Sequence, residues 1–374
     1  MTSLCYRHPT IFYSYIHYRI QEVSMAKKTP PFEFAGLSID AGKHINCELE
    51  IARLYTHSPL SVSVDILHGK HPGPILLINA AIHGDELNGI EVVRQVIEKI
   101  DLNKLHGTII AVPVVNVFGF IHKSRYLPDR RDLNRCFPGS ERGSIAGRMA
   151  YQYFNQVVRR ASHVIDLHTA AIYRTNLPQI RANLENPLAK EMAMAFGSPV
   201  VVDASLREGS LRAAAEEFNI PVITFEAGEA LRLDPHAVGS GVQGVLKVMR
   251  HLNMLRTSRS KKVIEPMVPK ATRWIRADYD GLLRSHVALG EKVSKDQVIA
   301  TISDPAGSSE APVIAPQGGI VIGQQTLPLV NEGDAIFHIA FFEEPDGLVE
   351  EQVESYLDDA IEELDDELKW GMTN

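Results

Sequence analysis

The stretch Pro74-Ile75-Leu76-Leu77-Ile78-Asn79-Ala80-Ala81-Ile82-His83-Gly84-Asp85-Glu86 decides the fold. Its apolar part is almost continuous, a pattern that predicts a strand buried on both faces of a parallel sheet. The run then ends in polar residues, among which His83 and Glu86 are three positions apart. Because sites in open α/β sheets form where strands end, this junction is the first candidate site.

Similar runs recur between residues 60 and 255, where segments rich in Ile, Val and Leu alternate with helical stretches. Such alternation predicts an α/β fold in which a mixed sheet is flanked by helices. The predicted strands are 74–82, 108–115, 163–168, 198–203 and 220–226, and the predicted helices are 86–100, 145–160 and 210–219.

The composition changes along the chain, and 374 residues exceed what one core usually serves. We predict an α/β domain over 31–260, a small all-β domain rich in Gly turns over 263–342, and an acidic amphipathic helical tail over 343–374. Residues 1–30 are predicted to be a disordered extension or the product of a misassigned start, because Met25 begins a more ordinary N-terminus.

Charge and cysteine content exclude several classes of function. The net charge is −8, but residues 343–370 hold thirteen acids and one Lys, so the rest of the chain carries about +4. The chain has no run dense in Lys and Arg of the kind that indicates nucleic-acid binding, and its apolar runs are too short to cross a membrane. The three scattered cysteines, Cys5, Cys47 and Cys136, favour a reducing cytoplasm. We therefore expect a cytoplasmic protein whose partner is a small molecule.

A second apolar run ends in His168, two residues after Asp166. Two His and one Glu leave the fourth tetrahedral position of Zn²⁺ open, as catalysis needs. Taken alone, His83 could be a surface residue and Glu86 an acid favoured by a helix dipole. The second strand that ends in His favours the metal site. Asp166 is a partner either for the outer nitrogen of a ligand or for a helix terminus or an Arg.

Two further segments carry candidate chemistry. Residues 124–139 are dense in Arg, and within them Arg125 and Arg135, with Asn134 beside the latter, suit carboxylate binding. The alternative is a solvated basic loop. Glu226 ends the predicted strand 220–226 and could accept a proton from water, or it could be a buried carboxylate paired with an Arg. Glu229, three residues later, is not excluded from the same role.

Four ordered motifs resemble the succinylglutamate desuccinylase/aspartoacylase family, a branch of the carboxypeptidase A-like zinc hydrolases. They are His83-Gly84-Asp85-Glu86, Arg131-Asp132-Leu133-Asn134-Arg135, Asp166-Leu167-His168 and Phe225-Glu226-Ala227-Gly228. The resemblance covers roughly residues 60–340 and implies a zinc carboxypeptidase-like fold. It also implies residue roles: His83, Glu86 and His168 as ligands of one Zn²⁺ per subunit, Glu226 as general base and acid, Asn134 and Arg135 as binders of the substrate α-carboxylate, and Arg125 as the group that polarises the scissile carbonyl.

The all-β segment resembles a biotinyl/lipoyl-type barrel over residues 281–320. A carrier barrel needs a Lys at its hairpin tip, and the corresponding stretch, 303–312, contains none. We therefore expect a structural appendage that shapes or covers the site.

These features predict a zinc-dependent deacylase that hydrolyses the amide of a small N-acyl amino acid, that is, an amidohydrolase acting on bonds other than ordinary peptide bonds. The alternatives are a metallocarboxypeptidase acting on short peptides and a non-catalytic zinc-binding protein. The acyl group is not fixed by the sequence. A second carboxylate could be bound by one of several arginines that could equally be surface charges, and the apolar stripe of the tail could contact a second copy in a homo-oligomer. These arginines are Arg130, Arg174, Arg181 and Arg207.

Overall fold

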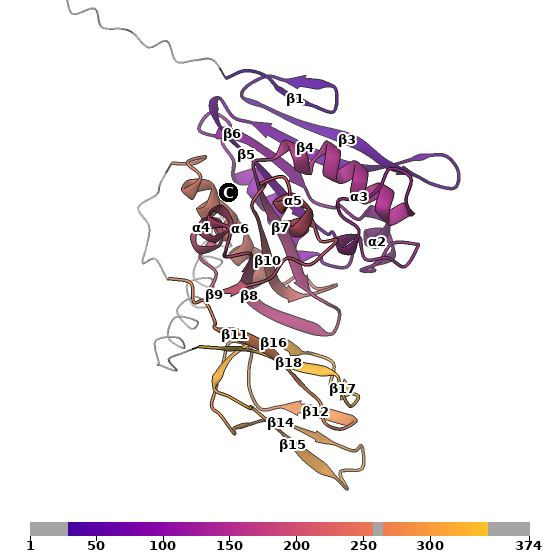
Figure 1. Cartoon of the computed structure of the whole chain (residues 1–374), viewed down its shortest axis with the longest axis vertical. Coiled ribbons are helices and arrows are strands. Elements are labelled where there is room, and N and C mark those ends of the chain that lie inside the picture. Colours follow the sequence, from indigo (N-terminus) through magenta and orange to yellow (C-terminus); the bar gives the residue numbers. More distant parts are fainter. Residues whose placement is uncertain (1–28, 257–264, 343–374) are drawn as a thin grey trace, which may run out of the picture.

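The computed structural model describes residues 29–256 and 265–342. Its largest element is a twelve-stranded mixed sheet. The strands of this sheet are β3 (Lys43–Arg53), β4 (Pro59–His68), β5 (His71–Ala80), β6 (His106–Val112), β7 (His163–Ala170), β8 (Arg174–Ala182), β9 (Val200–Asp203), β10 (Val222–Glu229), β11 (Ala271–Arg276), β13 (Lys292–Val293), β16 (Gly319–Gln325) and β18 (Ala335–Phe341). The main path runs β11-β18-β16-β8-β10-β7-β5-β6-β4-β3, with β9 beside β8 and β13 beside β16 (Figure 1).

Helices cover both faces of the α/β part of this sheet. The helices are α1 (Asn88–Lys99), α2 (Val117–His122), α3 (Ile145–Gln156), α4 (Pro187–Phe196), α5 (Leu211–Glu216) and α6 (Pro235–His251), with the short 3-10 helices η1 (Leu133–Arg135) and η2 (Val158–Arg160). Apolar residues of α1, α4 and α6 pack in one core, whereas those of α3 and α5 pack in the core on the opposite face. The predicted mixed sheet with flanking helices is confirmed.

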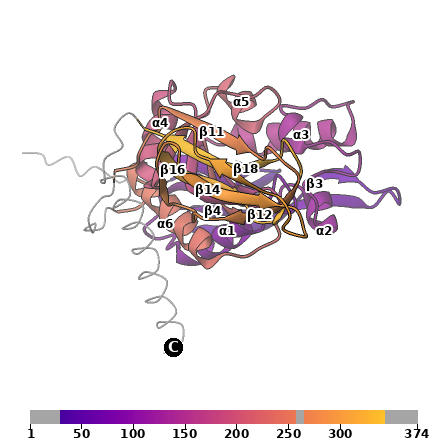
Figure 2. The ribbon, with the colours of Figure 1, turned by 90° about the horizontal axis from the view of Figure 1, so that it is seen from below.

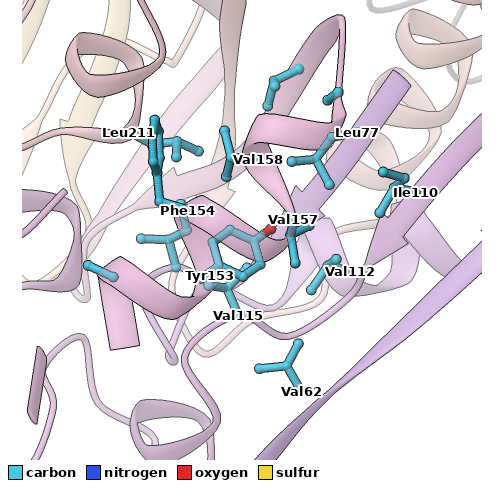
Figure 3. Close-up of a cluster of buried hydrophobic side chains, with 14 of the residues drawn as sticks. Val62, Leu77, Ile110, Val112, Val115, Tyr153, Phe154, Val157, Val158 and Leu211 are labelled. Carbon is cyan, nitrogen blue, oxygen red and sulfur yellow. The ribbon is translucent and has the colours of Figure 1, made fainter. Parts of the chain in front are cut away.

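The second of these cores shows how an apolar helix face meets the sheet. Figure 3 shows Tyr153 and Phe154 of α3 lying among aliphatic side chains of the neighbouring strands. Leu77 of β5 and Ile110 of β6 belong to the same cluster and are fully buried. Burial of apolar area of this kind contributes about 25 cal/mol per Å² and holds the layers together.

The central strands bring the predicted site residues to one edge. β5 is parallel to both β6 and β7, and β7 is parallel to β10, so these four strands end at the same side. In the register of β7 and β10, His168 and Glu226 are direct neighbours. The strand predicted over 74–82 therefore ends beside the strands predicted over 163–168 and 220–226.

The C-terminal segment is all-β, as predicted, but its strands form two sheets. β16 pairs with β8, so β11, β16 and β18 extend the central sheet. The remaining strands form a separate four-stranded sheet that packs over the first (Figure 2). In sheet order they are β15 (Glu310–Ile314), β14 (Val298–Ser303), β12 (Gly281–Ser285) and β17 (Leu329–Val330).

Some sequence predictions lie outside this description. A short hairpin of β1 (Phe32–Phe34) and β2 (Leu37–Ile39) opens the described part. The predicted extension, apart from residues 29 and 30, and the predicted acidic tail over 343–374 fall outside the described residues. In the described part, no helix has the length and apolar character needed to cross a membrane.

Candidate metal centre

His83, Glu86 and His168 converge at the edge where β5 and β7 end. The Nδ1 atoms of both histidines face the Glu86 carboxylate, each 2.7 Å from one of its oxygens. The two Nδ1 atoms are themselves 3.2 Å apart. All three residues are buried, and one ligand atom from each lies within 4.8 Å of the others, so this group could hold a metal ion.

The loop that carries His83 and Glu86 differs from the prediction in two respects. A turn is present, in which the Glu86 N–H donates to the His83 carbonyl, but α1 begins at Asn88, so Glu86 precedes the helix. Gly84 is not needed for a left-handed backbone. A Cβ there would lie 2.0 Å from the carbonyl carbon of Gly119 in α2. The glycine is required because the backbone of α2 passes against the loop.

The outer nitrogens of both imidazoles are held by carboxylates. His168 Nε2 lies 2.8 Å from Asp166, which also accepts a hydrogen bond from Asn79. His83 Nε2 lies 3.1 Å from Asp132. These contacts hold the Nε2–H of each ring, so Nδ1, which faces Glu86, is the nitrogen that a bound metal would take in place of a proton. Of the two roles considered for Asp166, the structure therefore shows the ring partner.

Asp132 is the residue at this centre to which sequence analysis assigned no role. It lies within the Arg131–Arg135 motif, but its position next to His83 depends on how residues 125–135 fold back over the sheet edge. Its carboxylate also caps η1 by accepting from the Asn134 N–H. The same carboxylate receives two hydrogen bonds from Arg125, so one acid fixes a loop, an arginine and an imidazole.

The electrostatics of the centre are dominated by these close pairs. Burial alone would raise the pKa of Glu86, but His83 and His168 hold that pKa well below its usual range. Burial would lower the pKa of His168, but Asp166 and Glu86 raise it well above its usual value. A cation that replaced the protons shared by these groups would meet a negative carboxylate and two imidazole lone pairs.

A cavity of about 360 Å³ opens beside these ligands. It is lined by both histidines, by Glu226, and by residues from the 125–135 segment. The predicted site residues that line it are His83, Arg125, Asn134, Arg135, His168 and Glu226. Glu229 is not among the lining residues; its carboxylate accepts hydrogen bonds from the Tyr173 N–H and the Thr326 hydroxyl. The structure thus separates Glu226 from Glu229.

Residues 72–252 match the succinylglutamate desuccinylase/aspartoacylase catalytic domain. The chain belongs to this family. The matched segment begins in β5 and ends just after α6, so it contains the whole metal group and Glu226. The resemblance inferred from four motifs is confirmed.

Family relatives share most of the chain with this protein. N-alpha-acetyl-L-2,4-diaminobutyric acid deacetylase of Halomonas elongata is 28% identical over 285 residues, which cover 72% of this chain and 82% of that protein. The product-bound ectoine utilization protein EutE (DoeB) of Ruegeria pomeroyi superposes with a TM-score of 0.72 at 21% identity, covering 84% of this chain and 99% of that one. A succinylglutamate desuccinylase/aspartoacylase of Rhodobacter sphaeroides gives 0.69 at 21% identity, covering 79% and 94%. The two structures show that the fold is shared.

In this member of the desuccinylase/aspartoacylase family, the contacts of each predicted catalytic or substrate-binding residue are defined by the structure. Glu226 accepts a hydrogen bond from Asn176 at 3.1 Å. Arg125 lies 3.3 Å from Glu86 while donating to Asp132. Asn134 accepts the Leu211 N–H through Oδ1, so its amide nitrogen remains the group it can offer a ligand. Arg135 is exposed at the cavity wall.

The family motifs do not include the residues on the other side of the cavity, away from the 125–135 segment. Arg181, Arg207 and Arg212 line it, and the first two were only candidates among four in the sequence. The C-terminal strands add Trp274 of β11 and His338 of β18 to the same wall, together with Thr272. No local motif predicts these residues, because only the pairing of β16 with β8 brings them to the site.

Proposed function

We propose that the protein is a zinc-dependent deacylase that hydrolyses the amide bond of a small N-acyl amino acid or related amide. One observation carries the proposal: a carboxylate, Glu226, shares a cavity with a buried His-Glu-His group and with a pair of residues suited to carboxylates, Asn134 and Arg135. The deacetylase from Halomonas elongata, whose name specifies an N-acetylated diamino acid, supports a small N-acyl substrate.

Zinc suits the donor set. Two imidazole nitrogens and one carboxylate oxygen form a catalytic zinc set that leaves one position open. The two Nδ1 atoms are 3.2 Å apart and each lies 2.7 Å from a Glu86 oxygen, so all three residues can reach one ion. Such a site supplies Lewis-acid chemistry that makes water a nucleophile near neutral pH.

Glu226 is proposed as general base and then general acid. Its carboxylate takes a proton from the attacking water as the new C–O bond forms at the amide carbon. It gives that proton to the departing nitrogen as the C–N bond breaks. The hydrogen bond from Asn176 holds one Glu226 oxygen in place, so the other is directed to this task.

The arginines are proposed to orient the substrate. Arg125 is anchored by Asp132 at the metal group, where a remaining N–H can face the scissile carbonyl oxygen and stabilise its developing charge. Arg135 and the Asn134 amide would hold the α-carboxylate of the amino acid at the neighbouring wall.

The walls favour a small substrate over a peptide. Trp274 and His338 of the C-terminal strands line the cavity, so these strands form part of its wall, and we propose that they limit the length of the substrate. We accordingly propose the division into a hydrolase domain over 31–260 and a smaller β domain over 263–342. In this division the β domain is a biotinyl/lipoyl-like appendage that shapes the site.

Substitution of Glu226 tests the function. The zinc-loaded Glu226→Gln variant should retain its metal and lose about 10²- to 10⁴-fold in kcat on the N-acyl amino acid that the unmodified protein hydrolyses best, as expected for loss of a general base. Glu229→Gln, on the same strand but outside the cavity, is the control and should keep full activity.

The substrate screen should compare N-acetyl and N-succinyl amino acids with short peptides. Faster hydrolysis of peptides would replace the deacylase by a carboxypeptidase. A protein purified without loss of fold that binds no zinc, or a Glu226→Gln variant with undiminished turnover, would refute the proposed mechanism.

A further inference from the structure

The strand that carries Glu226 changes its pairing register directly after that residue. β10 pairs residue for residue with β7 up to Glu226, which lies opposite His168. The next paired positions, Glu229 and Ala170, are three residues further along β10 but only two further along β7. β10 therefore carries one extra residue, a β-bulge that contains residues 227 and 228. Its pairing with β8 is interrupted at the same place. A bulge beside an active site changes the direction of a neighbouring side chain, which here is that of Glu226.

The bulge has a left-handed residue and a contact from outside its own strand. Gly228 has a φ of +72°, a conformation that glycine adopts at little cost. The Ala227 carbonyl accepts a hydrogen bond from the side-chain amide of Asn88, at 3.2 Å. A Cβ at Gly228 would lie 2.5 Å from the nitrogen of the same amide. Asn88 thus lies directly against both residues of the bulge.

Both ends of the Asn88 amide have a backbone partner. Its oxygen accepts the Asp234 N–H at 2.9 Å, while its nitrogen donates to Ala227. Because a backbone N–H can only donate and a carbonyl can only accept, these partners fix the orientation of the amide. The side chain is buried, so solvent does not compete for either hydrogen bond. Asn88 therefore holds the segment 227–234 at both ends, directly after Glu226.

Asn88 is itself fixed relative to the metal group. It follows Glu86 by two positions and begins α1. The next residue, Gly89, lies so close to the sheet that a Cβ there would be 2.8 Å from the Cβ atoms of Ala80 in β5 and Leu167 in β7. These two strands carry the metal group at their ends. The position of Asn88 is therefore set by the same strands that set the metal group.

Two further hydrogen bonds join residues 85–88 to the region of the bulge. The Thr169 N–H, which lies on β7 between its two paired positions, donates to the Glu86 carboxylate at 3.2 Å. The Leu231 N–H donates to the Asp85 carbonyl at 2.7 Å. Residues 85–88 are thus bonded to both strands at the point where the pairing of these strands is interrupted.

We propose that Asn88 is a positioning residue for Glu226 and that it acts through the bulge. By holding the Ala227 carbonyl, Asn88 sets where β10 leaves its pairing with β7, and hence where the Glu226 carboxylate lies relative to the metal group. The inference rests on the proposed function, in which Glu226 moves a proton from water to the departing nitrogen. A general base must lie within hydrogen-bond reach of that proton, so a displaced Glu226 should slow turnover without weakening substrate binding.

The first experiment is a double-mutant cycle on the full zinc-loaded chain. Asn88→Ala removes the amide, and Gly228→Ala places a Cβ in the space that the amide occupies. Each change alone should lower kcat about 10- to 100-fold, while KM and zinc content stay within about twofold. The double variant should lose no more kcat than the worse of the two single variants, because both changes break one contact. Losses that multiply would show that the two residues act separately and would overturn the proposal.

Two control variants separate this contact from general effects on the backbone. Gly307 also has a φ of +72°, but no described residue beyond its chain neighbours comes within 4 Å of an added Cβ. Gly307→Ala therefore measures the strain of the left-handed backbone alone. Asn186→Ala removes another Asn that holds backbone N–H groups, at the start of α4 and outside the cavity. Both controls should keep the kcat of the unmodified protein.

The second experiment does not depend on turnover. Hydrogen exchange followed by mass spectrometry measures the protection of the backbone N–H groups of residues 227–234. In Asn88→Ala, exchange there should become about 10-fold faster, as expected for loss of a buried hydrogen bond, while α4 should be unchanged. A crystal structure of the variant should show the Glu226 carboxylate displaced from the position in which it accepts from Asn176. Gly228→Ala serves both measurements where Asn88→Ala fails to fold.

The outcomes separate this inference from the proposed function. A displaced Glu226 with undiminished turnover would support the positioning role and refute Glu226 as general base. If the unmodified protein hydrolyses no N-acyl amino acid, the deacylase is refuted, and a displaced Glu226 still supports the positioning role. A Glu226 in its original place, with unchanged exchange over 227–234, would overturn the positioning role and leave the deacylase standing.

Discussion

The metal group (His83, Glu86 and His168) and the far wall of the same cavity differ in whether their polar atoms have hydrogen-bond partners. At the metal group, each imidazole is held at both nitrogens, by Glu86 on one side and by Asp132 or Asp166 on the other. At the far wall, which includes Arg181 of β8 and His338 of β18, Arg181 has only an ion pair with Glu226, at 3.7 Å, and the buried Nδ1 of His338 has no hydrogen-bond partner among the described residues. The first region is complete without substrate, and the second lacks a partner that a substrate could supply.

This difference shows which side chains of the site are held in place by the protein itself. Ligand geometry that is set by carboxylates and by backbone contacts does not depend on what is bound. Unsatisfied donors in a rigid wall select the ligand that satisfies them. Substitutions at the metal group should therefore change metal binding, whereas substitutions at the far wall should leave the metal content unchanged.

The largest effect is expected for Gly84→Ala. The added Cβ would meet the backbone of Gly119 and Phe120 at 2.0 and 2.1 Å, and backbone cannot rotate away as a side chain can. We expect a loss of about 3 kcal/mol or more in the free energy of unfolding, the upper end of overpacking costs, together with weaker metal binding. Thermal and denaturant unfolding measure it.

Gly147→Ala is the matched control for this change. Gly147 lies within α3, and a Cβ there would meet the Ser144 hydroxyl at 3.5 Å and the Ser140 nitrogen at 4.0 Å, both ordinary van der Waals contacts. The substitution should be neutral or slightly stabilising, since Ala favours helix. Equal stability of the Gly84→Ala variant and the unmodified protein would contradict the view that α2 fixes the metal loop.

A smaller effect is expected for Asp166→Asn. The change removes the charge that faces His168 Nε2, and the loss of such an outer partner typically lowers metal affinity about 10- to 100-fold. Competition with a chelator of known affinity measures it. Asp65→Asn, which alters a surface Asp–His pair with His44, should leave metal affinity unchanged. An unchanged affinity in Asp166→Asn would mean that the ring partners do not set the metal site.

The smallest effect is expected for Asn176→Ala, which lies between the two regions. Asn176 donates to Glu226 and pairs across the sheet with Gly323, the neighbour of His338 on the next strand. Loss of this hydrogen bond to a charged group should lower kcat about 10-fold without changing zinc content. Asn155→Ala in α3 is the control. A fall in metal content as well would show that the two regions are not independent.

The sequence predicts the parts of the site that follow buried strands. The apolar runs that end in His83, His168 and Glu226 are the strands β5, β7 and β10 with their flanks, and they lie side by side because parallel neighbours end at one edge. The long antiparallel pair β3 and β4 was not predicted, because the predicted strands were taken from continuous apolar runs. The signal in β4 is of the other kind: Leu60, Val62 and Val64 alternate with polar residues, as is typical of a strand with one buried face.

Other features depend on contacts that no local pattern encodes. Gly84 is required by its contact with the backbone of α2, which lies more than thirty positions away in the sequence. Asp132 meets His83 only through folding of the 125–135 segment. His338 reaches the cavity because β18 pairs with β16 and β16 with β8, a register set by long-range strand pairing. Such register is a property of the assembled sheet.

The pairing of β16 with β8 has a further consequence. Arg174, Thr175 and Asn176 are hydrogen-bonded to a strand that comes some 150 residues later in the chain. Until that strand arrives, this part of β8 presents free N–H and C=O groups, and an unpaired edge is a template for strands of other chains. The C-terminal strands thus also cover the edge of the sheet. A nascent or truncated chain that lacks them exposes an unpaired strand edge, so self-association competes with folding until these strands pair with β8.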